Sequence, residues 1–191
     1  MQKKPVQTNA TRQAFIDAFC QLAIKKSLTK ISIQELAQRA GYNRCTFYQY
    51  FQDINDLLVF LEEQLIRRIK EAVLKNMGCH SMERSFILAF SDIHQQEKRY
   101  FDTLLKLEQV NSFGDRLKKI MIPALIELLK IPSQEKKAVY ALEFYFGGVI
   151  SATSRWLLDG RELNTDEIAA LIRSLSNEGV WPYLTASEVD K

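Results

Sequence analysis

The chain has few residues of the kinds that build disulfide frameworks or metal sites. It contains three cysteines and two histidines among 191 residues. Because Cys20, Cys45 and Cys79 are odd in number and far apart, we expect neither a disulfide framework nor a zinc site. A chain of this length buries a core without such support, as one domain or two small ones. No metal and no cofactor are expected, and the cysteine usage favours a reducing, cytoplasmic setting.

The sequence patterns of enzymes are also missing. There is no glycine-rich phosphate loop and no Gly-x-Ser-x-Gly turn. His80 and His94 lie at no known ligand spacing from a cysteine or from paired carboxylates. The N-terminal lysines are not followed by the apolar run of a secretory signal. We therefore predict no catalytic residue, no enzyme activity and no export.

Every strong hydrophobic periodicity in the chain is helical, and no run alternates between apolar and polar residues as a strand would. The fold class is therefore predicted to be all-α. A head is expected in residues 1–53 and a helical regulatory and dimerisation body in residues 54–191. Capping and breaking residues predict helices at about 8–26, 32–40, 43–51, 54–77, 81–96, 99–109, 113–130, 133–158 and 165–177.

Residues 32–51 carry the most informative pattern. Ser32 and Glu35 have the spacing of a capping box, in which the hydroxyl takes the amide of residue 35 and the carboxylate returns to the amide of residue 32. Gly41 follows the apolar positions of that helix, at the point where a left-handed residue would end it. Asn43 can cap a second, very short helix. Two short helices joined in this way are typical of a helix-turn-helix, with a generic helical hairpin as the less favoured reading.

Charge is unevenly distributed along the chain. Residues 1–60 hold eight lysines and arginines against four acidic residues, a net charge of +4. The rest of the chain carries a net charge of −1. A basic N-terminal third on a nearly neutral body is typical of a head that binds nucleic acid.

Residues 138–158 are apolar nearly all round, which makes a membrane span the first alternative to consider. Glu143, Arg155, two glycines and several hydroxyl groups within the segment argue against it. A helix that is apolar on all sides must instead be covered on all sides by protein. No membrane association is predicted.

We expect residues 133–177 to form a dimerising pair of helices. Gly147 and Gly148 would allow a second helix to approach closely, and Val149 and Ile150 are expected to offer outward-facing positions. Burial of this pair inside a single subunit is the alternative.

At this point the residues resemble the tetracycline-repressor (TetR) family of bacterial transcription regulators. The resemblance is specific over about residues 8–60 and architectural beyond them. It implies a homodimer whose heads bind a palindromic operator in double-stranded DNA and whose body releases the operator when a small-molecule effector binds. The matching residues are Ile33-Gln34-Glu35-Leu36-Ala37, Ala40-Gly41-Tyr42-Asn43, Thr46-Phe47-Tyr48-Gln49-Tyr50-Phe51 and Asp56-Leu57-Leu58.

The resemblance also implies which residues contact DNA. Arg44 and Gln49 present groups suited to the edges of guanine and adenine, whereas hydroxyl groups suit phosphate oxygens, which position the protein without reading sequence. The residues carried over from the family are Ser32, Asn43, Arg44, Cys45, Thr46, Tyr48, Gln49 and Tyr50.

Two positions depart from the family pattern. Ile54 stands where the family often has a basic residue, so one phosphate contact is expected to be absent. Cys45 stands at a site more often held by a small or rigid residue, next to Arg44 at a helix start. A redox-sensing thiol is conceivable there, and a small residue tolerated at the DNA surface is favoured.

An effector pocket would need polar groups among the many aromatic residues of the body, and His94, Glu108 and Glu143 are the candidates. The favoured function is a ligand-released dimeric repressor. A DNA-binding regulator whose body is a protein-interaction module is the second reading. An enzyme with an accessory DNA-binding head is the third, disfavoured by the missing catalytic pattern.

Overall fold

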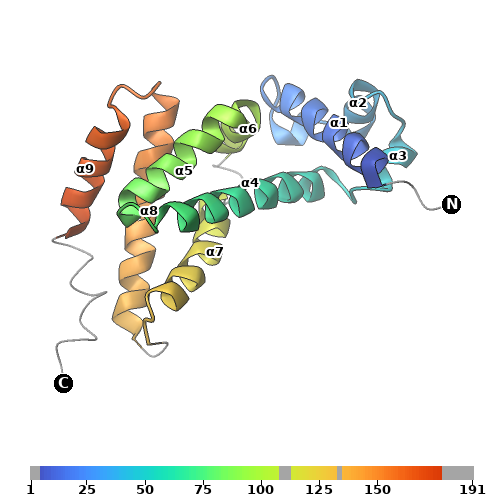
Figure 1. Ribbon diagram of the computed structural model, residues 1–191. Helices are drawn as coiled ribbons and strands as arrows, with labels where there is room; N and C mark the ends of the chain where they lie inside the picture. The colour runs from blue at the N-terminus through green and yellow to red at the C-terminus, as the bar shows by residue number, and fades with distance from the viewer. Residues whose placement is uncertain (1–4, 108–112, 133–134, 178–191) are drawn as a thin grey trace. The chain divides into compact units, whose positions relative to one another are not determined.

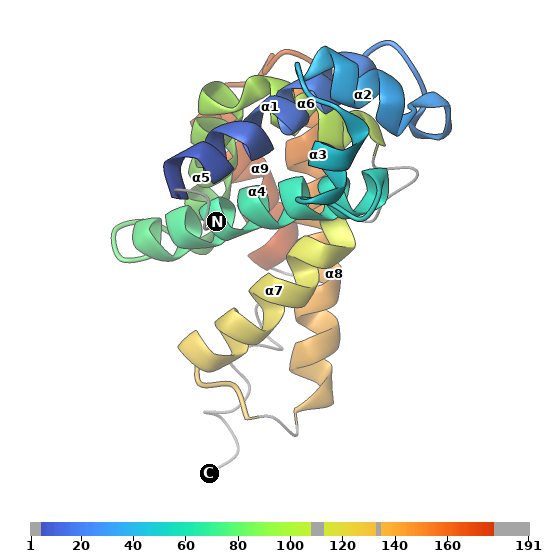
Figure 2. The ribbon, with the colours of Figure 1, turned by 90° about the vertical axis from the view of Figure 1, so that its right-hand side faces the viewer.

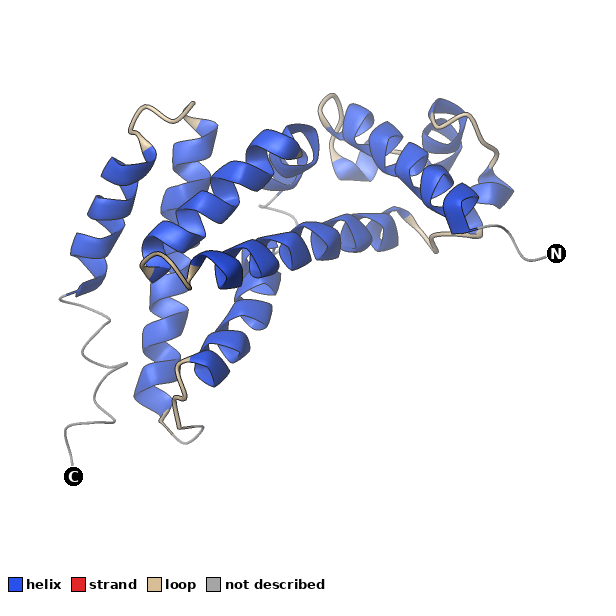
Figure 3. Ribbon diagram, viewed as in Figure 1, coloured by secondary structure: helices blue, strands red, loops and turns tan. Residues whose placement is uncertain are grey.

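The computed structural model describes residues 5–107, 113–132 and 135–177, and within these ranges the regular structure is helical throughout (Figure 1; Figure 3). The all-α prediction is confirmed. The chain divides into two compact units, one of residues 1–65 and 99–107 and the other of residues 66–98 and 108–191. The predicted division after residue 53 lies at the start of α4 (Ile54–Asn76), whose first half belongs to the first unit.

The first unit is built around an aromatic core. Phe15, Phe47 and Phe51 are buried, and the rings of Phe15 and Phe47 meet edge to face with centroids 5.3 Å apart. Burial of Phe47 and Phe51 confirms the inward face predicted for the second motif helix. The unit contains α1 (Pro5–Ala23), the short 3-10 helix η1 (Leu28–Lys30), α2 (Ile33–Arg39), α3 (Arg44–Tyr48), the start of α4 and α6 (Lys98–Leu107).

The capping box at the start of α2 forms only in part. The Ser32 hydroxyl accepts a hydrogen bond from the Glu35 amide at 3.2 Å, as predicted. The predicted return bond from Glu35 is wrong, because its carboxylate instead accepts a bond from Lys26 Nζ at 2.7 Å. Lys26 lies just beyond α1, so this ion pair ties the end of α1 to α2.

The turn between α2 and α3 has the predicted geometry. Gly41 has a φ of +79°, a conformation that side chains with a Cβ rarely adopt. The Tyr42 amide then donates to the Ala37 carbonyl at 2.9 Å, which satisfies a carbonyl at the end of α2. Asn43 Oδ1 accepts from the Thr46 amide at 2.8 Å and caps α3 as expected.

Polar contacts join α6 to α1 within the first unit. Asp17 on α1 accepts a hydrogen bond from the Tyr100 hydroxyl and pairs with Arg99 at 3.7 Å. Gln13 Nε2 donates to the same tyrosine oxygen at 2.6 Å. These partners are more than 80 positions apart in the chain, and periodicity along the chain could not have paired them.

Within the described residues, the second unit contains the second half of α4 and four further helices. Its core is aromatic as well, with Phe86 and Phe90 stacked at 4.9 Å and Phe146 at 5.3 Å from Phe86. The helices α7 and α8 lie side by side in two views (Figure 1; Figure 2), and α5 packs against both α8 and α9. The helices are α5 (Met82–Gln96), α7 (Phe113–Leu128), α8 (Lys136–Leu158) and α9 (Thr165–Asn177).

The helix α8 has one buried and one exposed face. Val149 and Ile150 are buried within the chain, so the prediction that they offer outward-facing positions is wrong. Tyr140 and Phe144 lie on the exposed face instead, with 72% and 73% of their surface accessible. Gly148 shares that face, and nothing lies within 4 Å of a Cβ built on it.

Candidate DNA-binding site

The α2–turn–α3 segment presents most of the residues predicted to touch DNA on one exposed stretch of the first unit. Two of them, Thr46 and Tyr50, are half-buried and therefore held by the surrounding core. The exposed ones are Ser32, Asn43, Arg44, Cys45, Tyr48 and Gln49.

The entry of α3 is ordered by Asn43. Its Oδ1 accepts both the Thr46 amide at 2.8 Å and the Thr46 hydroxyl at 3.1 Å. Both Ser32 and Asn43 thus use a side-chain oxygen as a helix cap, which fixes their position and occupies an acceptor. The Thr46 hydroxyl already donates its proton to Asn43 and keeps only its acceptor lone pairs. It therefore has no donor left for a phosphate oxygen while this bond is in place.

Arg44 is the cation at the start of α3. It is exposed, and among the described residues no hydrogen bond or ion pair involves its guanidinium group. Such an arginine need not break a bond to another protein group before it binds DNA. Its fork of donors matches guanine or a phosphate. The Cys45 thiol beside it is exposed and forms no disulfide within the described residues.

The tyrosines of α3 and its end are oriented by packing. The Tyr48 ring lies edge to face against Phe47 at 5.7 Å, while half of its surface stays exposed. Arg12 on α1 places its guanidinium carbon 5.9 Å from the centre of the Tyr50 ring. Sequence reasoning missed Arg12, since no local pattern links α1 to a residue 38 positions away.

Acidic residues at the start of α4 serve the backbone. Asp53 Oδ1 accepts the Asp56 amide at 2.8 Å, confirming the predicted cap, and Asp56 Oδ2 accepts the Gln52 amide at 2.8 Å. Ile54 between them is half-exposed. This corner of the first unit therefore offers no side-chain cation from residues 52–56.

Two of the predicted effector-binding residues, His94 and Glu143, lie in the described ranges and contact different partners. His94 is buried, with Arg161 Nη2 3.0 Å from its Nδ1. Glu143 is exposed on α8 and pairs with Lys118 of α7 at 3.5 Å. Glu108 lies outside the described residues, and the effector roles of all three stay predictions.

In the described ranges, His, Cys, Asp and Glu side chains never gather in a group of three suited to a metal ion. The described helices also include none with the length and apolar character needed to cross a bilayer.

Comparison with known proteins agrees with this geometry. Residues 15–59 match the family described as bacterial regulatory proteins of the tetR family, and residues 83–178 match the family described as transcriptional regulator C-terminal region. A capped helix-turn-helix with an exposed polar second helix defines a DNA-binding regulator of transcription. The chain belongs to the TetR family of these regulators.

Individual relatives match over different lengths. An uncharacterized helix-turn-helix transcriptional regulator of Haemophilus influenzae is 35% identical over 78 residues, which cover 37% of this chain and only 38% of that protein. The matched part is therefore well under two thirds of this relative.

Solved structures match over nearly the whole chain. The fatty acid degradation regulator FadR from Bacillus halodurans has a TM-score of 0.62 at 17% identity, covering 94% of this chain and 97% of that chain. NalD, the secondary repressor of the MexAB-OprM efflux pump in Pseudomonas aeruginosa, has a TM-score of 0.61 at 20% identity, covering 89% of this chain and 96% of that chain. At these identities the likeness shows the shared fold.

Proposed function

We propose that this regulator is a dimeric, cytoplasmic repressor that binds a palindromic operator through α3 and leaves it when a small molecule binds the second unit. The observation that carries the proposal is the exposed, unpaired Arg44 at the capped start of α3. The DNA-contacting set stays as predicted, with Arg44 and Gln49 as readers of bases. The other members of the set position the helix on the sugar-phosphate backbone of the DNA; they are Ser32, Asn43, Cys45, Thr46, Tyr48 and Tyr50.

Dimerisation is supported by the exposed face of α8. Aromatic side chains seldom stay three-quarters exposed on a monomer, and Tyr140 and Phe144 lie one helical turn apart. On α9, Leu171 and Leu175 are also exposed and lie one turn apart. Gly148 leaves room for a second helix, since nothing lies within 4 Å of a Cβ built there. A second copy of the chain is the occupant that fits a two-fold DNA site.

Release by an effector requires that the effector prefer one head separation over another. Two heads on one duplex face must match grooves about 34–36 Å apart, so a change of a few ångströms weakens binding. A body that binds a partner protein instead of a small molecule is the second candidate. Mass spectrometry of small molecules that copurify with the chain separates the two, because only an effector-binding body retains a defined metabolite.

Selection of operators from random duplex DNA tests the proposed function. The expected product is an inverted repeat bound at nanomolar to ten-nanomolar concentration, in the range of about 10⁻⁸–10⁻¹¹ M typical of specific regulators. An Arg44→Ala protein selected in parallel serves as the matched control. Enrichment of the same sequences by both proteins would show that Arg44 does not read a base, and enrichment of none by the unmodified chain would refute the proposed function.

A further inference from the structure

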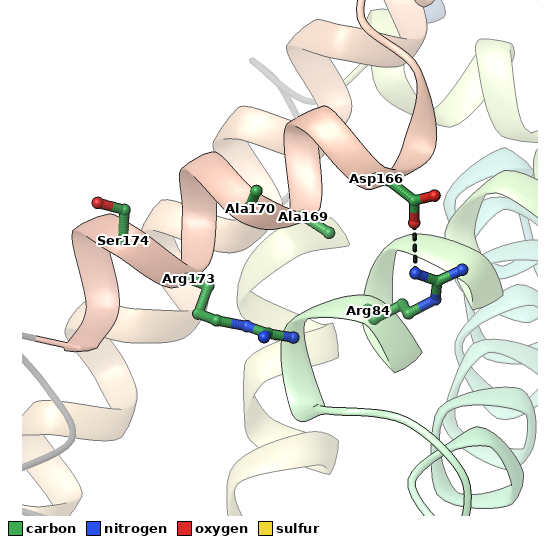
Figure 4. A pocket seen from close by; sticks show the side chains of 6 residues that line it. All are labelled: Arg84, Asp166, Ala169, Ala170, Arg173 and Ser174. Atoms are coloured by element: carbon green, nitrogen blue, oxygen red, sulfur yellow. Dashed lines mark hydrogen bonds and ion pairs between the residues drawn. The ribbon is translucent and has the colours of Figure 1, made fainter.

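Two arginines line a hollow between α5 and α9 in the second unit. Arg173 extends from α9 toward α5, and Arg84 extends from α5 toward Asp166 on α9 (Figure 4). The hollow has a volume of about 420 Å³, within the range of small-molecule sites. Its lining residues are Arg84, Asp166, Ala169, Ala170, Arg173 and Ser174.

The polar groups of this hollow are only partly satisfied. Arg84 Nη1 bonds to Asp166, yet Arg84 Nε is buried and has no hydrogen-bond acceptor among the described residues. Arg173 Nη2 donates to the Ser81 hydroxyl at 2.6 Å, while its Nε lies 3.8 Å from the buried Glu83 carboxylate, beyond hydrogen-bond distance. Both guanidinium groups therefore keep donors for a further acceptor, and a buried donor without one is costly.

Charge decides which ligand fits. The lining residues carry two positive charges and one negative charge, and the buried carboxylate of Glu83 lies 3.8 Å from Arg173 Nε. Asp166, which accepts the bond from Arg84 Nη1, is 68% exposed and can turn into solvent at little cost. An incoming carboxylate or phosphate can take its place and use the fork of Arg84 in two bonds.

The remaining walls are small and apolar. Ala169 and Ala170 border the arginines, so a ligand with a short hydrocarbon part would cover both methyl groups. The exposed leucines of α9, Leu171 and Leu175, do not line the hollow. The hollow thus uses other side chains of α9 than the two leucines proposed for dimerisation.

We propose that the hollow between α5 and α9 binds a small organic anion, a carboxylate or a phosphate monoester with a short apolar body. Arg84 and Arg173 hold the anionic group, and Asp166 is the internal carboxylate that it displaces. This inference does not depend on DNA binding, because the site is assembled from residues of the second unit alone.

Titration calorimetry of the full chain with butyrate and with butyl phosphate tests the proposal, and butyramide serves as the uncharged counterpart of butyrate. The expected result is saturable binding of at least one anion and none of butyramide. Arg84→Gln and Arg173→Gln should each weaken binding about tenfold or more, because each removes charge-assisted bonds. Arg155→Gln is the matched control, since Arg155 pairs with Asp159 on the surface and lies outside the hollow.

Asp166→Asn gives the sharpest outcome. Removing the competing carboxylate should tighten anion binding about two- to fivefold, whereas a purely structural ion pair would predict no gain. Circular dichroism checks that each variant is folded. If an arginine variant is unfolded, the affinity of Asp166→Asn for the anions and the lack of butyramide binding by the unmodified chain still test the proposal. The proposal is overturned if the unmodified chain binds neither anion at ligand concentrations up to about 100 mM. It is also overturned if butyramide binds as well as butyrate, or if Asp166→Asn binds the anions more weakly than the unmodified chain.

Discussion

Among single residues, Arg44 and Tyr48 divide the recognition surface into reading and positioning. Both are exposed at α3, but only Arg44 offers a fork of donors that distinguishes bases. The Tyr48 hydroxyl suits a phosphate, which looks alike under every base.

Arg44→Ala, and likewise Gln49→Ala, is expected to weaken the preferred operator by about 1–3 kcal/mol and to relax the base choice at one position of each half-site. Tyr48→Phe should weaken all sequences about equally. Fluorescence anisotropy with the operator and with single-base variants measures both effects. Unaltered base preference in both alanine variants would show that α3 is docked wrongly.

Ile54 offers a gain-of-contact test. The acidic neighbours of Ile54 are used as backbone caps, and residues 52–56 supply no cation. Ile54→Lys is expected to raise affinity for specific and nonspecific DNA together. It should steepen the salt dependence by about one unit for each added phosphate contact. Titrations at several salt concentrations measure the slope, Ile54→Gln controls for loss of the isoleucine, and an unchanged slope in the lysine variant would contradict the prediction.

Cys20 makes stability depend on pH. Burial raises the pKa of this thiol from 9.0 to about 11, against a smaller lowering by its hydrogen bond with Thr103. The folded chain therefore holds the thiol proton more tightly than the unfolded chain. Its stabilising effect is complete below pH 9 and is lost as the pH rises through 11.

Loss of this effect should lower the free energy of unfolding by about 2–3 kcal/mol across that window. Urea denaturation in reducing buffer at several pH values, with Cys20→Ala for comparison, measures it. The alanine variant should lose less stability than the unmodified chain, while Cys79→Ala, at an exposed thiol, should follow the unmodified chain. Parallel curves for all three would show that Cys20 does not titrate as described.

At the scale of elements, α3 is too short to be stable alone and depends on its cap. A helix of five residues gains little from its own hydrogen bonds. Asn43→Ala removes the acceptor of both Thr46 bonds and is expected to destabilise the chain by about 1 kcal/mol, with weaker operator binding as α3 frays. Asn43→Asp keeps the acceptor and serves as the stability control. Equal urea midpoints for Asn43→Ala and the unmodified chain would contradict this.

The elements of the head could be predicted from sequence because their signals are local. The caps at Ser32, Asn43 and Asp53 and the left-handed turn at Gly41 each depend on residues within a few positions. The return bond predicted for Glu35 is wrong because Lys26, just beyond α1, pairs with the same carboxylate. Local spacing cannot reveal such a competitor.

The element faces of the body were harder to predict. A helix that is apolar all round has no periodicity to show which side faces its own core, so Val149 and Ile150 were placed on the wrong face of α8. Likewise, α6 lies in the compact unit of the head through Asp17, Tyr100 and Arg99, which only folding brings together. The contact between His94 and Arg161, 67 positions apart, could not be predicted from spacing along the chain, and the effector role of His94 stays a prediction.

At the scale of the whole molecule, the proposed function requires two chains acting together. Phe144 is 73% exposed on α8, and a charged substitution there costs the single chain little. Phe144→Glu is therefore expected to separate the dimer without unfolding it. Glu143→Gln, at the neighbouring surface position paired with Lys118, is the matched control.

Sedimentation of the chain with a selected operator is the most direct test of the central claim. The account predicts two chains per inverted repeat, a dimer in the absence of DNA at micromolar concentration, and about one turn of duplex, 34–36 Å, between the half-site centres. Phe144→Glu should sediment as a monomer and bind the operator at least about tenfold more weakly. One chain per operator at saturation, or an unmodified protein that is monomeric at that concentration, would contradict the account.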